Sequence, residues 1–132
     1  MKIFTRLVLV ILTLGFGCGS DGAPDHPCIS GKIVGQKCGI YALQLNEAKL
    51  NATQWSKKNL ITGEIEGVYS NVIGLINLPE ENRVEGQIVF VELREPTNEE
   101  KTISCYADMP SIPSPLYIVL FASNSKCKET KE

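Results

Sequence analysis

Short apolar runs separated by turn-forming residues are the feature that most constrains the fold of this chain. Glycine, proline, asparagine and charged residues interrupt the apolar runs repeatedly between residues 29 and 123. A strand needs only a few alternating residues, whereas an amphipathic helix needs a longer run with a period near 3.6. The runs that fit strands are residues 29–35, 40–45, 71–78, 87–95, 102–106 and 116–123. The sequence therefore predicts a mainly β domain.

Alternation within these runs predicts which side chains face the core. In residues 87–95, Val89, Val91 and Leu93 alternate with Glu92 and Arg94, so the three aliphatic side chains are expected to point inward. Residues 40–45 place Tyr41, Leu43 and Leu45 on one face, and the turn "GQKCG" before them predicts a hairpin with residues 29–35. The run 71–78 is apolar on both faces and is expected to be central. The run 116–123 must be covered on both faces, because it would otherwise aggregate.

Two segments give weaker patterns. Leu45, Ala48, Ala52 and Trp55 are spaced by three or four residues, so we expect a short helix or an irregular stretch over residues 47–57. We expect a weak strand near residues 64–69. The proline-rich stretch "MPSIPSP", residues 109–115, is expected to be a loop or a sheet edge.

Five to seven strands with at most one short helix predict a small closed or half-closed β-barrel. The stretches "GKIVG", "CGIYALQL" and "NVIGLINLPEENRVEGQIVFVEL" resemble the oligonucleotide/oligosaccharide-binding (OB) barrel of small envelope lipoproteins of Bacteroidetes-like bacteria. The resemblance implies an OB-like barrel over residues 28–127, followed by a charged tail at 128–132. The members of this group are largely uncharacterised, so the resemblance implies architecture and location but no activity.

The first seventeen residues resemble an export signal. Lys2 and Arg6 precede the apolar run "LVLVILTLGFG", residues 7–17. At about 1.5 Å per residue, a helix of this run is too short to cross a hydrocarbon core about 30 Å thick. We therefore expect a helical signal peptide over residues 1–17 that is removed on export.

The residues before Cys18 resemble the lipobox of bacterial lipoproteins, in which a leucine and small residues precede an acylated cysteine. Here Leu14, Phe16 and Gly17 precede Cys18, with the leucine four positions before the cysteine instead of the usual three. The resemblance implies a palmitate-type acyl anchor on Cys18 and a flexible tether over residues 18–27. Ordinary signal cleavage near Gly17, without lipid, is the alternative.

The cysteine count favours lipidation, because an exported domain tends to pair its thiols. If Cys18 of the five cysteines carries lipid, four remain for two disulfides: Cys28, Cys38, Cys105 and Cys127. A straight strand between Cys28 and Cys38 would separate them by about 30 Å, whereas bridged Cα atoms lie within about 7 Å. That leaves Cys28–Cys127 with Cys38–Cys105, or Cys28–Cys105 with Cys38–Cys127. We favour the first, which ties the two ends of the domain together.

The sequence offers little catalytic or metal-binding chemistry. The only histidine, His26, lies in the predicted tether, and no Cys-x-x-Cys spacing exists. The carboxylates lie in turns and on the polar faces of strands, so we expect no enzyme, no metal and no cofactor. A net charge of −2 argues against binding to nucleic acid.

Three residues are candidates for contact with a ligand or partner. Trp55 lies among polar residues, Tyr41 is an aromatic residue of a predicted strand, and Pro113 lies in the proline-rich loop. Alternatively, the two aromatic rings pack in the core, and the loop only connects to the last strand without contacting a partner.

These features predict an exported protein that a lipid on its N-terminus anchors in the bacterial cell envelope, at the outer membrane. Its partner would be an envelope protein or a glycan, and its β domain would bind or support without catalysis. A secreted inhibitor of a protease or lysozyme, inserting the loop 109–115, is the alternative function.

Overall fold

The structure, a computed structural model, describes residues 28–59, 61–103 and 112–127. The predicted signal peptide, Cys18, the tether and the charged tail lie outside these residues. The described chain forms six strands and one 3₁₀ turn. These are β1 (Cys28–Lys37), β2 (Ile40–Leu45), β3 (Thr53–Lys58), β4 (Ile65–Ile76), η1 (Glu80–Asn82), β5 (Ile88–Arg94) and β6 (Leu116–Ser123).

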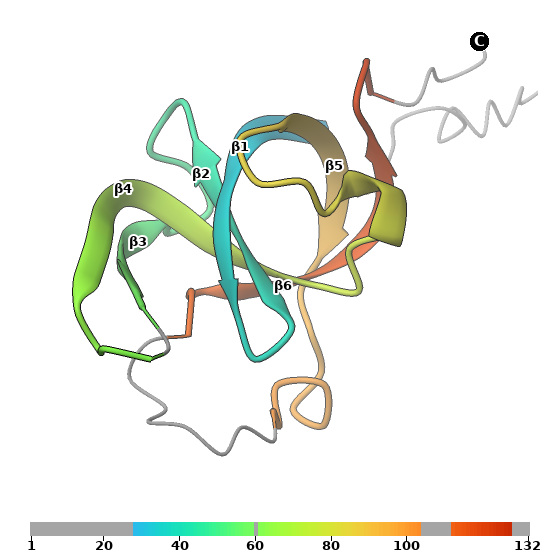
Figure 1. The fold of residues 1–132 in the computed structure, drawn as a ribbon. Helices are drawn as coiled ribbons and strands as arrows, with labels where there is room; N and C mark the ends of the chain where they lie inside the picture. Colours follow the sequence, from blue (N-terminus) through green and yellow to red (C-terminus); the bar gives the residue numbers. More distant parts are fainter. Residues whose placement is uncertain (1–27, 60, 104–111, 128–132) are drawn as a thin grey trace, which may run out of the picture.

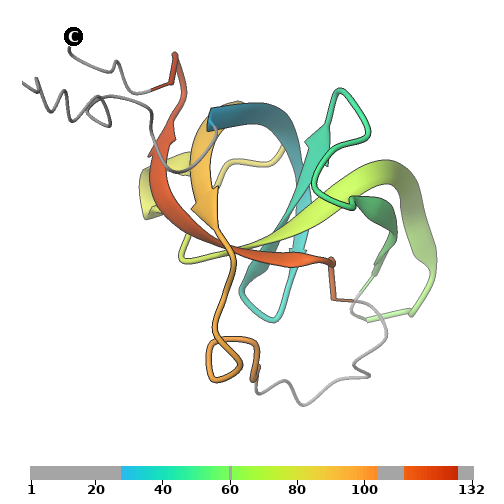
Figure 2. The same ribbon diagram turned by 180° about the vertical axis from the view of Figure 1, so that it is seen from behind.

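The strands close into a small barrel, as the sequence predicts. The order β2-β1-β5-β6-β4-β3 is completed by a pairing of β2 with β4, so that five strands form a ring and β3 attaches outside it (Figures 1 and 2). The pairing of β4 with β6 is parallel and the others are antiparallel. With β3 set aside, this ring has the strand order of an OB barrel.

The predicted hairpin of the first two strands is confirmed. Lys37 pairs with Ile40 across a two-residue turn at Cys38 and Gly39, whose φ angles are +55° and +80°. Two positive φ angles match the twist of a tight hairpin, and glycine adopts such an angle without a steric penalty.

The barrel interior holds the side chains that alternation placed there. Val89 and Val91 are fully buried and Leu93 is 4% exposed. They join Leu43 and Leu45 of β2 in one cluster with residues of β1, β4 and β6. The apolar run of β6 is covered less completely than predicted, because Leu120 remains 46% exposed while its neighbour Val119 packs inside.

No helix forms over residues 47–57, where we expected a short helix or an irregular stretch. Residues 46–52 are irregular, in line with the second of these expectations. Leu50 and Asn51 have φ angles of +57° and +55°, which a right-handed helix excludes. Residues 53–58 form β3 instead, paired antiparallel with β4. The three- and four-residue spacing was misleading because Leu45 packs inside the barrel, whereas Trp55 packs on its outer surface.

β4 unites the weak strand predicted near 64–69 with the apolar run at 71–78. Its first half pairs with β3, and its second half pairs with β2 and β6. The strand curves strongly between the two halves (Figure 1). Because of this curve, the β3–β4 hairpin lies on the outside of the barrel.

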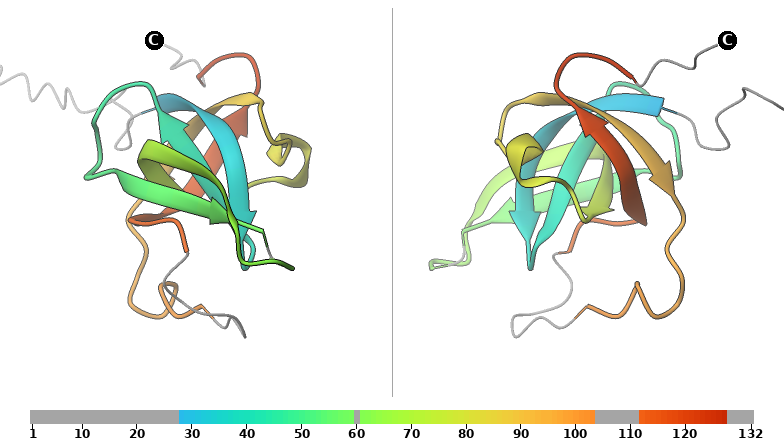
Figure 3. Two further views of the ribbon diagram at one scale, coloured as in Figure 1. Left: turned by 60° about the vertical axis from the view of Figure 1, so that its left-hand side comes forward. Right: turned by 90° about the vertical axis from the view of Figure 1, so that its right-hand side faces the viewer.

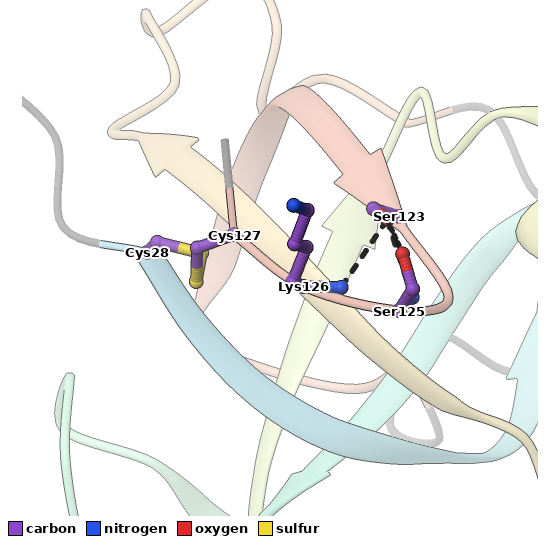
Figure 4. The surroundings of a disulfide bond; sticks show 5 residues. All are labelled: Cys28, Ser123, Ser125, Lys126 and Cys127. Carbon is purple, nitrogen blue, oxygen red and sulfur yellow. Dashed lines mark hydrogen bonds between the residues drawn. A yellow bond between two sulfur atoms is a disulfide. The ribbon is translucent and has the colours of Figure 1, made fainter. Parts of the chain in front are cut away.

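A disulfide joins Cys28 at the start of β1 to Cys127, with a Cα–Cα distance of 5.8 Å. After β6, the Ser123 hydroxyl accepts backbone N–H bonds from Ser125 at 3.2 Å and Lys126 at 3.5 Å (Figure 4). This turn directs the chain toward Cys28. The favoured pairing of Cys28 with Cys127 is therefore present, and Cys38 is disulfide-bonded as well. Its predicted partner, Cys105, lies outside the described residues.

Candidate functional site

The β3–β4 hairpin covers part of the outer face of the barrel. Trp55, 5% exposed, packs with Val34, Ala42 and Val72 in a second apolar cluster outside the ring. A Cβ atom on Gly35 would lie 2.9 Å from the Trp55 ring, so glycine is what lets the ring approach the β1 backbone. The hairpin is thus a packed layer on the barrel.

Two side-chain interactions hold the inner side of this hairpin. The rings of Trp55 and Tyr69 face each other across the strand pair, with centroids 6.3 Å apart and planes at 25°. The Lys57 ammonium donates a hydrogen bond to the Glu85 carboxylate in the turn before β5. This bond raises the pKa of Lys57, so the ion pair is present throughout the neutral range.

Beside the hairpin, the outer face of the barrel remains open as a groove. Two hollows, of about 370 and 400 Å³, share Lys32 and Gln44 in their lining and therefore lie side by side. We call this surface the outer groove; its lining includes Lys32, Gln44, Tyr69, Asn71, Glu85 and Ile88.

Strand register places the floor of the outer groove. Lys32 of β1 lies directly opposite Gln44 of β2 on one side and opposite Ile88 of β5 on the other. Directly opposed residues share a face of the sheet, so these three side chains form a row. Ile88 is 57% exposed, which leaves an apolar surface at one end of the row.

The bend of β4 forms the wall. Asn71 has a φ of +55°, and the Gln44 side-chain amide donates a hydrogen bond to the Ser70 carbonyl at 3.2 Å. This bond links the floor of the outer groove to its wall. Amide, hydroxyl and backbone groups therefore line the hollow on two sides.

Among the described residues, Lys32 is the only charged side chain in the first hollow. Glu85 shares the second hollow with it but is bonded to Lys57. Within the described part of the chain, no carboxylate lies within ion-pair distance of Lys32. The outer groove thus presents a cation whose charge the described residues do not neutralise.

The three candidate contact residues lie elsewhere. Trp55 and Pro113 are buried, with Pro113 under 2% exposed, so their placement favours packing within the domain: Trp55 is buried between the hairpin and the outer face of the barrel. Tyr41 is half-buried, and the Arg83 guanidinium lies 5.6 Å from the centre of its ring. None of the three lines the outer groove.

The sequence does not single out Lys32 or Gln44, because both look like ordinary solvent-facing residues of alternating strands. Only the register of three strands brings them together with Ile88. The exposed Ile88 is the one signal that the sequence offers, since it adds an outward apolar residue at the start of a strand.

No group of three or more histidine, cysteine, aspartate or glutamate side chains that could hold a metal ion occurs in ranges 28–59, 61–103 and 112–127. In the same ranges, no helix has the length and apolar character needed to cross a membrane. Comparison with known proteins gives no family model that matches this chain and no similar curated protein.

Proposed function

We propose that the chain is an exported envelope protein, anchored through an acylated Cys18, whose barrel is a non-catalytic binding module. The observation that carries this proposal is the Cys28–Cys127 disulfide, which brings both ends of the domain together. The chain enters and leaves the barrel at one end, and the β1–β2 turn and the loop after β5 lie at the other (Figures 1 and 3).

This arrangement suits a protein anchored at its N-terminus. A tether over residues 18–27 spans at most about 35 Å when fully extended and about 17 Å on average when flexible. The domain would stand close to the membrane, with its entry end toward the lipid. The outer groove lies on the side of the barrel, formed by β1, β2, β4 and β5, where such an anchor leaves it accessible.

Acylation is tested by the intact mass of the mature N-terminal peptide together with fractionation of the envelope. We expect Cys18 as the first residue, with a mass increase equal to its acyl chains, and the protein in the membrane fraction. Cys18→Ser should release the protein, because acyl chains contribute roughly 0.8 kcal/mol per buried CH₂. The neighbouring Ser20→Ala is the control and should stay with the membrane. A free Cys18 thiol, or a mature chain that lacks Cys18, refutes the lipid anchor.

A second candidate function, inhibition of a protease or lysozyme, is favoured by the tip of the β3–β4 hairpin. The Asn59 side-chain oxygen accepts N–H bonds from Ile61 at 2.8 Å and Thr62 at 3.1 Å, which fixes the turn. Ile61 is 94% exposed and could enter a partner's pocket. Inhibition that Ile61→Asp abolishes and Val84→Asp leaves intact would support this function over the first.

A further inference from the structure

We infer that the outer groove binds a saccharide that carries a carboxylate, with Lys32 as its charge partner. This inference rests on the proposed function only in so far as the barrel is a binding module. It does not require the lipid anchor. It assigns a chemical class of ligand to the hollow that β1, β2, β4 and β5 form beside the hairpin.

The charge of the outer groove favours an anionic ligand. Lys32 has no ion-pair partner among the described residues, while Glu85, the acidic group nearby, is bonded to Lys57. Gln44 lies directly opposite Lys32 and can orient a bound carboxylate beside it. A hydrogen bond from an ammonium to a carboxylate is roughly twice as strong as one between neutral groups.

Amide groups beside an exposed apolar side chain favour a sugar ring in the outer groove. A pyranose presents hydroxyl groups at its rim and C–H groups on its faces, so it needs amide partners beside an apolar surface. Asn71 and Gln44 supply amides, and Ile88, together with the half-buried ring of Tyr69, supplies apolar contact. Each hollow falls within the usual volume range of small-ligand sites, roughly 300–1,000 Å³.

Other anionic partners fit the outer groove less well. A nucleic acid needs several cations along its backbone, and Lys32 is the only basic residue among the described residues that line the two hollows. An acidic peptide shares the carboxylate, but peptides gain specificity from apolar pockets for alternate side chains. In the first hollow, the large aliphatic side chains are Leu45 and Ile88, and Leu45 is 5% exposed.

The test uses the mature full chain with the substitution Cys18→Ser. This variant cannot carry the proposed lipid, and saccharide binding does not require the lipid. Three acidic probes are titrated while backbone amide shifts are recorded: a galacturonate trimer, a hyaluronan tetramer and a disaccharide that contains muramic acid. A maltotriose and a tetraglutamate peptide serve as neutral and peptide comparisons. We expect at least one acidic saccharide to shift the amides of Lys32, Gln44 and Ile88. Maltotriose should bind more weakly.

Lys32→Gln separates a specific charge contact from general attraction. It should weaken binding of the acidic saccharide roughly three- to tenfold, as expected for a partly exposed charged hydrogen bond. Lys101→Gln, which removes an exposed cation from the β5–β6 loop, is the control and should leave the affinity unchanged. Raising the salt concentration should weaken the wild-type complex more than the Lys32→Gln complex.

Several results would overturn this inference. One is the absence of amide shifts with all three acidic saccharides, or shifts that map outside the outer groove. Another is that the two lysine substitutions change the affinity equally. A third is that tetraglutamate binds as tightly as the saccharides. An acylated Cys18 with no saccharide binding refutes the ligand and leaves the anchor standing. A free Cys18 thiol with saccharide binding refutes the anchor and leaves the ligand standing.

Discussion

Substitution of Trp55 by alanine tests whether the β3–β4 hairpin is a packed layer on the barrel. The Trp55 ring is 5% exposed, lies close to Gly35 and packs with Val34, Ala42 and Val72. Alanine would remove most of the contact between the hairpin and the outer face. It would leave the barrel interior unchanged, because Trp55 belongs to a separate cluster.

The magnitude follows from the area that Trp55 buries. An aromatic side chain buries roughly 150–250 Å², which at about 25 cal/mol per Å² amounts to about 4–6 kcal/mol. Measured Trp→Ala changes in cores cost about 3–5 kcal/mol. Because β4 is the only described strand that pairs with β3, part of this loss can appear as local opening of the hairpin. We therefore expect the free energy of global unfolding to fall by about 3 kcal/mol. The rest of the lost packing energy should lower the cost of opening the hairpin locally, which speeds amide exchange in β3.

The assay is urea unfolding followed by circular dichroism, with hydrogen exchange of the β3 amides measured in parallel. Trp55 is the only tryptophan, so the fluorescence of the wild-type protein reports on this site alone and should show the short-wavelength emission of a buried indole. Val68→Ala is a suitable control on the same hairpin, because Val68 is 54% exposed and its loss should cost under about 0.5 kcal/mol.

Two results would refute this reasoning. A Trp55→Ala cost below about 1 kcal/mol without faster β3 exchange would mean that the hairpin does not pack on the barrel. Indole fluorescence with the emission and quenching of a solvated ring would mean that Trp55 is exposed and available to a ligand.

The remaining predictions concern the disulfide, an acidic turn and a glycine. Cys28→Ala should destabilise the domain by up to about 4–5 kcal/mol, measured by thermal unfolding, because the lost bridge spans 99 residues; an unchanged melting temperature would contradict this. Arg94 donates hydrogen bonds to Glu100 and, together with the backbone N–H of Thr97, lowers the pKa of Glu100 to about 2. The depressed pKa means that Glu100 stabilises the fold above about pH 4.5 and loses this effect as the pH falls toward 2, so Glu100→Gln should flatten the acid side of the stability–pH curve. A curve that retains its slope would show that another carboxylate is responsible. Gly74→Ala should lower the free energy of unfolding in urea by about 1–3 kcal/mol, because the new methyl group would collide with the Pro113 carbonyl. An unchanged free energy would mean that the backbone around Pro113 moves to accommodate the methyl group.

Local sequence patterns were sufficient where the burial of a side chain depends only on its position in its own strand. Val89, Val91 and Leu93 alternate with charged residues, and alternation alone placed them inside. The choice of Cys127 as the partner of Cys28 required only the reach of a strand and the expectation that the domain ends meet.

Local patterns failed where a residue's surroundings come from distant segments. Trp55 looked exposed among polar neighbours, yet Val34 and Ala42 of two other strands form its surroundings. The expectation of a helix or an irregular stretch failed over residues 53–58 for the same reason, since pairing with β4 satisfies the backbone there and overrides a helical spacing.

The sequence by itself determined the β class, the first hairpin and the inward faces of the strands, because these depend on alternation and turn chemistry within a few residues. Only the tertiary structure decided that β4 bends to carry the hairpin onto the barrel, and that Lys32, Gln44 and Ile88 lie in one row beside it. The physical reason is that cross-strand register joins residues far apart in the chain. A surface built across four strands therefore has no signature within any one of them.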